Sequence, residues 1–148
     1  MTGAVLVAAL LLVWAGLAKA WRPSGTGRAL RSVGLPSSDW AVRAIAAVEA
    51  AIGAGAILAG GAFDVAMAVS YAGFAVWIGV ALRRRWPLSS CGCFGVADAR
   101  PTVAHLVADG ALAGVALVAA ASRTDPVRAL ARHPAQGAAA VLLATVTA

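Results

Sequence analysis

Four long apolar segments dominate the sequence, and they restrict the fold more than any other feature. They cover residues 5–20, 42–60, 63–82 and 102–121. A helix needs about 20 residues to cross a hydrocarbon core of about 30 Å. Hydrophobic residues make up 61% of the 148-residue chain and charged residues only 12%, and a soluble domain of this length cannot bury so much apolar surface. The sequence therefore predicts an all-α, four-helix transmembrane bundle over residues 1–122.

The connections between these segments fit the same architecture. Residues 21–39 are rich in Gly, Pro and Ser and predict a turn or a short interfacial helix. The glycine pair at 60–61 predicts a tight turn, so the second and third segments form an antiparallel hairpin. Residues 123–148 predict a short amphipathic tail, with a surface helix that carries Arg128 and Arg132 on one face and a short apolar end.

The first apolar segment has a second interpretation, as a cleaved signal peptide. Ala18-Lys19-Ala20 resembles an A-x-A cleavage site after an apolar run, but no positive charge precedes that run. We therefore interpret the segment as a membrane helix. Amino-terminal sequencing distinguishes the two, because cleavage would give a protein that starts at Trp21.

The net charge of +6 comes mainly from Arg residues clustered between the apolar segments. Such clusters indicate topology signals and phospholipid headgroup contacts, and we expect no nucleic-acid partner. The positive-inside rule places the first and third loops in the cytoplasm. The tail argues against this orientation, since it adds three basic residues to the opposite side. The basic residues of the first and third loops are Lys19, Arg22, Arg28, Arg31, Arg43, Arg83, Arg84, Arg85 and Arg100.

The only two cysteines, Cys91 and Cys93, lie two residues apart between the third and fourth segments. Neighbouring Pro, Ser and Gly residues indicate an exposed turn, which disfavours a role as small buried side chains. A closed zinc site needs four ligands, and the chain has only two histidines, so we expect no such metal site. A Cu(I) ion bound by the two thiolates is an alternative.

A redox pair explains the cysteine spacing better. A disulfide between Cys91 and Cys93 closes a small ring, and Gly92 supplies the backbone freedom that this ring needs. Strained disulfides are more oxidising and more labile. The nearby Arg cluster and the start of a helix at Pro101 both favour the reactive thiolate. The sequence therefore predicts that Cys91 and Cys93 are the catalytic pair, in a loop shaped by Gly92, Phe94 and Gly95.

Several ionisable residues fall inside the apolar segments. Glu49 lies midway through the second segment, where a charge is costly and marks a functional candidate or a packing contact. Lys19 ends the first segment and either reaches the membrane surface or pairs with Glu49, although the two appear offset in depth. His105 and Asp109 share a face of the fourth segment, as a proton relay or a single hydrogen bond. We assign Lys19, Glu49, His105 and Asp109 to the polar interior of the bundle.

Small residues at helical spacing predict where the helices approach closely. Gly110 and Gly114 form a GxxxG pattern beside Asp109, and Glu49 and Gly53 lie on one ridge of the second segment. A further ridge consists of Ala47, Ala51 and Gly55. These patterns predict that the second and fourth segments touch and bring Glu49 and Asp109 toward one interior.

On these residues, the chain resembles the MauE branch of the DoxX-like membrane proteins. The specific part of the resemblance is Cys91-Gly92-Cys93-Phe94-Gly95. The end of the first segment, Ala15-Gly16-Leu17-Ala18-Lys19, and the central Glu49 also match. The resemblance covers most of the chain to about Ala121. It implies a four-helix membrane protein linked to redox maturation, of the kind that matures the disulfide-rich beta subunit of methylamine dehydrogenase.

We therefore expect thiol–disulfide exchange, by an enzyme or an accessory, with a secreted or membrane client protein at the bacterial plasma membrane. The bundle could hold a quinone, although the sequence has no cofactor motif, and the chain could form oligomers. The alternatives are a non-enzymatic assembly or transport factor, a copper-binding protein, and a small-solute or proton carrier using Glu49. Oxidation of secreted clients belongs on the outer face, whereas the Arg distribution places the cysteines inside. Thiol labelling of intact cells with an impermeant reagent decides between the two sides.

Overall fold

The computed structural model describes residues 2–86 and 101–122, and the regular structure in these ranges is helical. All of its helices except the short second one are long and apolar enough to cross a membrane. The predicted all-α, four-helix transmembrane bundle is therefore confirmed for the described part of the chain. The predicted tail helix lies outside the described residues. The helices are α1 (Thr2–Trp21), α2 (Ser24–Ser32), α3 (Asp39–Leu58), α4 (Ala62–Arg83) and α5 (Val103–Ser122).

Local sequence signals explain where α3 begins and ends. The Ser38 hydroxyl accepts a hydrogen bond from the Ala41 N–H at 3.2 Å, which caps the first turn of α3. At the other end, Gly60 and Gly61 both have φ of +61°, a conformation that glycine adopts without steric cost. Asp64 then accepts a hydrogen bond from the Gly61 N–H at 2.8 Å and starts α4. The glycine pair thus makes the turn that was expected between these two helices.

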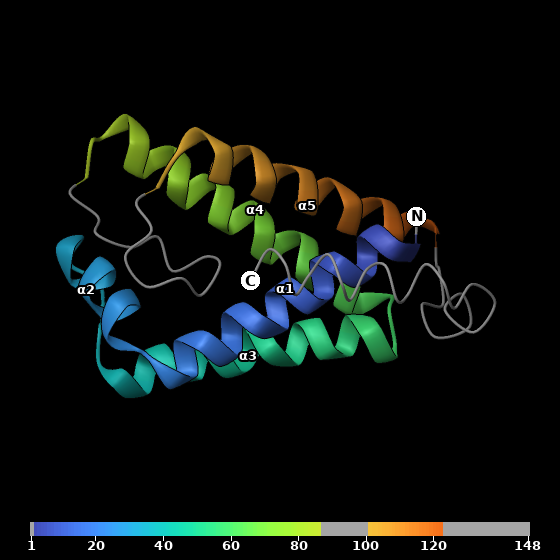
Figure 1. Ribbon diagram of the computed structural model, residues 1–148, viewed down its shortest axis with the longest axis horizontal. Helices are drawn as coiled ribbons and strands as arrows, with labels where there is room; N and C mark the ends of the chain where they lie inside the picture. Colours follow the sequence, from blue (N-terminus) through green and yellow to red (C-terminus); the bar gives the residue numbers. More distant parts are fainter. Residues whose placement is uncertain (1, 87–100, 123–148) are drawn as a thin grey trace.

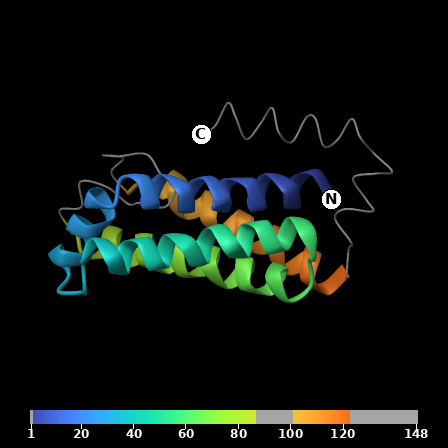
Figure 2. The ribbon, with the colours of Figure 1, turned by 90° about the horizontal axis from the view of Figure 1, so that it is seen from below.

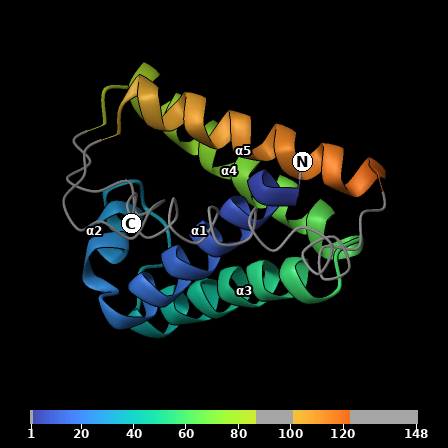
Figure 3. The same ribbon diagram turned by 45° about the vertical axis from the view of Figure 1, so that its right-hand side comes forward.

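The long helices form two antiparallel pairs, as Figure 1 shows. α1 packs along α3, and α4 packs along α5, while α3 and α4 contact each other over a shorter stretch. The two pairs diverge toward the end of the bundle that carries α2 (Figures 1 and 3). Figure 2 shows α2 at one end of the bundle, with the first residues of α1 and the α3–α4 turn at the other.

Glycines allow the closest approach in the bundle, between α1 and α3. A Cβ atom on Gly16 would lie 2.6 Å from the Ala46 carbonyl oxygen, and one on Gly53 would lie 2.7 Å from the Ala9 carbonyl oxygen. Such distances are too short for any real Cβ contact, so only glycine fits at these positions. The backbones of α1 and α3 therefore touch directly, as small-residue interfaces in membranes allow.

The expected contact between the second and fourth membrane segments is wrong. Their helices, α3 and α5, belong to different pairs, and the ridge with Gly53 faces α1 instead. The GxxxG residues of α5 are exposed, and a Cβ at Gly110 or Gly114 would meet no described residue within 4 Å. The GxxxG spacing marks a helix face that tolerates close packing, but it does not say which helix, if any, covers it.

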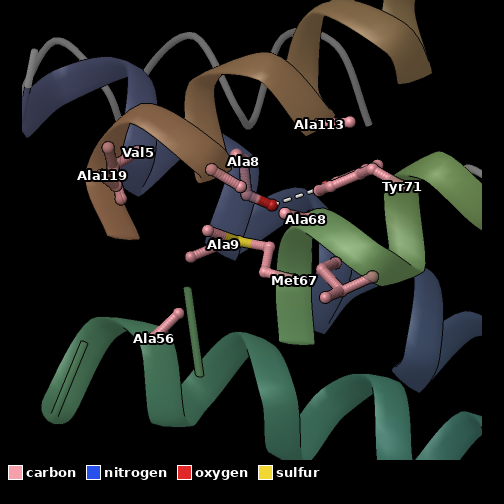
Figure 4. Close-up of a cluster of buried hydrophobic side chains, with 11 residues drawn as sticks. Val5, Ala8, Ala9, Ala56, Met67, Ala68, Tyr71, Ala113 and Ala119 are labelled. Atoms are coloured by element: carbon pink, nitrogen blue, oxygen red, sulfur yellow. Dashed lines mark hydrogen bonds between the residues drawn. The ribbon is translucent and has the colours of Figure 1, made fainter. Parts of the chain in front are cut away.

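A cluster of small and aromatic side chains joins the two helix pairs (Figure 4). Met67, Ala68 and Tyr71 of α4 are buried against α1, α3 and α5. The Tyr71 hydroxyl donates a hydrogen bond of 2.6 Å to the Ala8 carbonyl oxygen of α1, drawn as the dashed line in Figure 4. This bond crosses from one helix pair to the other, so Tyr71 fixes their relative position.

Candidate functional site

Each membrane-spanning helix contributes a buried ionisable side chain to the middle of the bundle, and α4 also carries the buried Asp64 at its first turn. Lys19 comes from α1, Glu49 from α3, Tyr71 from α4 and Asp109 from α5, and each is at most 5% exposed. We call these four residues the buried polar cluster. Ionisable groups inside a membrane are costly and are usually kept for function or for a specific partner.

Lys19 and Glu49 form the central ion pair of this cluster. The Lys19 ammonium donates a hydrogen bond to Glu49 Oε2, and both side chains are buried. The Lys19 ammonium also lies 5.0 Å from the centre of the Phe74 ring on α4, a cation–π distance. The pair is thus enclosed by three helices, and Lys19 does not reach the membrane surface. The surface alternative considered for Lys19 is therefore wrong.

Lys19 and Glu49 reach each other, despite their offset in depth along the helices, because of the direction in which the Lys19 side chain extends. Side chains on a helix tilt toward its amino terminus, so Lys19 extends back toward the level of Gly16. Gly16 packs directly against Ala46 and Ala50 on α3, and Glu49 lies beside them. The length of the Lys side chain and the glycine contact together bring the two charges into contact.

Tyr71 lies near both carboxyl groups of the buried polar cluster, those of Glu49 and Asp109. Its hydroxyl group donates to the Ala8 carbonyl oxygen. Its ring also packs edge-to-face on Phe74, with ring centres 6.0 Å apart. Glu49 and Asp109 thus share one polar interior around Tyr71, although the helices that carry them are not packed together.

His105 belongs to the first turn of α5 and is half-buried. Its backbone N–H donates to the Thr102 hydroxyl at 3.4 Å, and its Nδ1 accepts from the Thr102 N–H at 3.2 Å. Thr102 and His105 therefore cap the start of α5 reciprocally, in the manner of a capping box. This arrangement gives His105 a structural role at the end of the helix, closer to the surface than Asp109.

The predicted catalytic loop, Cys91, Gly92, Cys93, Phe94 and Gly95, lies outside the described residues, but its attachment points are defined. α4 ends in a Schellman motif, in which the Trp86 N–H donates to the Ala81 carbonyl oxygen at 3.0 Å. The Trp86 ring packs on Trp77, with ring centres 5.4 Å apart. Trp86 and Pro101 therefore attach the cysteine segment to the same end of the bundle, the end that carries α2 (Figure 1).

Sequence reasoning missed Tyr71 and Phe74 as parts of the site. Tyr71 is the only tyrosine in the chain and lies in the middle of an apolar segment. A buried tyrosine hydroxyl needs a hydrogen-bond partner. A tyrosine in an apolar segment therefore indicates a polar contact inside the bundle, and this was the signal in the sequence. Phe74 gave no such signal, since an apolar ring in a membrane helix is ordinary. Across residues 2–86 and 101–122, no three His, Cys, Asp or Glu side chains form a cluster suited to a metal ion.

Comparison with known proteins identifies one family. A family model described as "Methylamine utilisation protein MauE" matches residues 1–122. No curated protein and no solved structure matches the chain. The matched range contains all the described helices and both cysteines, and it stops where α5 ends.

Proposed function

Because the chain belongs to the MauE family of methylamine utilisation proteins, we propose that this multi-pass membrane protein exchanges thiols and disulfides with a client protein through Cys91 and Cys93. The observation that carries the proposal is the position of the chain's only two cysteines. They lie inside the family-matched range, on a segment whose two ends are attached to the same basic end of the bundle.

The exchange balances without any further reactant. A client thiolate attacks one sulfur of the Cys91–Cys93 disulfide, forms a mixed disulfide and displaces the other cysteine as a thiolate. A second client thiolate then attacks the mixed disulfide, which leaves the client oxidised and the cysteine pair reduced. Two electrons pass from the client to the pair, and two protons leave the client thiols. Run in reverse, the same steps reduce a client disulfide.

Neighbouring groups support this chemistry in our proposal. α4 ends at Arg83, and Arg84 and Arg85 follow it just before the cysteine segment. All three are exposed, and nearby positive charge favours the thiolate that attacks. His105 lies in the first turn of α5, just after the segment, and with Thr102 it fixes the start of that helix. The buried polar cluster holds the four helices in register beneath these groups.

The membrane side of the cysteine segment sets the direction of exchange. We propose a bacterial plasma membrane, in which the outer compartment is oxidising and the cytoplasm reducing. The described arginines gather at the α2 end, and the positive-inside rule orients this end toward the cytoplasm. On that side the pair would deliver reducing equivalents to a membrane client, and on the outer side it would oxidise a secreted one.

Trapping of a mixed disulfide tests the proposal. In the Cys91→Ser and Cys93→Ser variants one thiol remains, so an exchange intermediate cannot be resolved from within the chain. We expect at least one single variant to form a covalent adduct with a client in cells, detected on a non-reducing gel and lost after reduction. The Cys91→Ser/Cys93→Ser double variant is the matched control and forms none. If neither single variant forms an adduct, the proposal fails, and an assembly or copper-binding role would replace it.

A further inference from the structure

In the described part of the chain, the end of the bundle that carries α2 is strongly basic. Every arginine in the described part of the chain lies at this end, and every one is exposed. Among the described residues, Asp39 is the single acidic side chain there. We call these residues the arginine surface; it consists of Arg22, Arg28, Arg31, Arg43, Arg83, Arg84 and Arg85.

α2 presents part of the arginine surface from a fixed position across the bundle end. Its Gly27 and Ala29 are buried, and Ala29 packs with Ala81 of α4 beside Trp77 and Trp86. Arg28 and Arg31 lie on its exposed side. α2 is therefore an amphipathic helix, apolar toward the bundle and basic toward its surroundings, so its arginines face outward at the bundle end.

Two tryptophans define the depth of this surface in the membrane. Trp21 ends α1 and is 85% exposed, and Trp40 begins α3 and is 80% exposed. Tryptophan prefers the level of the lipid headgroups, where its ring is in apolar surroundings and its N–H is in water. The arginines around Trp21 and Trp40 therefore lie at the level of the lipid phosphates.

We propose that the arginine surface binds the headgroups of anionic phospholipids selectively, with α2 lying in the membrane interface. The arginine surface and an anionic headgroup have complementary charges. The guanidinium fork matches the oxygens of a phosphate, and the surface brings seven such groups together with one carboxylate among the described residues nearby. A zwitterionic headgroup carries its own cation and gains less from this surface. The inference does not depend on the proposed thiol chemistry.

Quenching of tryptophan fluorescence by brominated lipids tests the inference. The chain has five tryptophans, so Trp14, Trp77 and Trp86 are replaced by Phe in every protein compared, including the reference called wild-type here. Trp21 and Trp40 then report on the lipids beside the arginine surface. In vesicles of mixed composition, we expect brominated phosphatidylglycerol to quench the wild-type protein more than brominated phosphatidylcholine. Each arginine near an anionic surface contributes about fivefold in affinity. Arg22→Gln/Arg31→Gln/Arg43→Gln should therefore reduce the preference for phosphatidylglycerol by at least about fivefold.

Two controls separate charge recognition from a change in fold. The Arg22→Lys/Arg31→Lys/Arg43→Lys variant keeps the charge and should keep most of the preference. The second control is high salt, applied to the wild-type protein. Raising the ionic strength from about 0.05 to about 0.5 M shortens the Debye length from roughly 14 to 4 Å. We expect this to weaken the preference for phosphatidylglycerol. Equal quenching by both lipids in the wild-type protein at low salt would overturn the inference. So would a preference that high salt and the Gln variant both leave unchanged.

Discussion

Replacing Glu49 by Leu alone is expected to destabilise the bundle by about 3–5 kcal/mol, the usual effect of removing one partner from a buried ion pair. Lys19 is only 5% exposed, and Glu49 is its ion-pair partner. In the variant, the Lys19 ammonium remains enclosed by α1, α3 and α4 without its ion-pair partner. Unfolding of the purified protein in detergent micelles, followed by helical circular dichroism, measures the change in the free energy of unfolding.

The matched control for this prediction removes both charges together. A buried ion pair can often be replaced by apolar residues of similar volume at little cost, so Lys19→Met/Glu49→Leu should recover most of the stability that Glu49→Leu loses. Three variants, the two single changes and the double, complete a double-mutant cycle that isolates the pair. Two results would contradict the buried ion pair. One is a Glu49→Leu variant as stable as the wild-type protein. The other is a double variant whose loss in free energy of unfolding equals the sum of the losses in the two single variants.

Replacing Gly53 by Ala is expected to destabilise the protein by about 1–3 kcal/mol, the usual effect of forcing an extra group into a tightly packed interface. The added Cβ would lie 2.7 Å from the Ala9 carbonyl oxygen and 2.8 Å from Val13 Cγ2. The carbonyl belongs to the backbone of α1, so the contact is relieved only if α1 and α3 move apart. The same unfolding measurement in micelles quantifies the effect.

Gly114 of α5 provides a matched control for Gly53→Ala. A Cβ there would meet nothing within 4 Å, so Gly114→Ala should be neutral or stabilise the protein by up to about 1 kcal/mol through helix propensity. Both changes add one methyl group to a membrane helix, and only the packing differs. A larger loss of stability for Gly114→Ala than for Gly53→Ala would contradict the helix pairing in this structure.

The sequence was sufficient to predict what depends on local chemistry. Apolar length predicted the four membrane helices, and the glycine pair at 60–61 predicted the turn between α3 and α4. Both signals arise within a few consecutive residues and do not depend on which helices pack together. The buried position of Glu49 was foreseeable for a similar reason, because a carboxyl group among alanines in a membrane segment cannot face lipid at low cost.

The partners of the buried groups could not be predicted in the same way. The pairing of α3 with α1 depends on Gly16 of α1 and Gly53 of α3. The spacing of small residues on one helix does not identify the helix that packs against it. The meeting of Lys19 with Glu49 depends on this pairing and on the backward tilt of the Lys side chain. Tyr71 comes near both Glu49 and Asp109 because α4 packs against α3 as well as α5.

The most direct test of the central claim is a redox titration of the purified protein, with free thiols counted by mass after alkylation. The chain has only two cysteines, so each molecule carries zero, one or two labels. The account predicts a single two-electron transition, from two labels to none, as the redox buffer becomes oxidising, with the oxidised form a monomer containing a Cys91–Cys93 disulfide. Two free thiols at every potential, or a disulfide formed only between molecules, would contradict it.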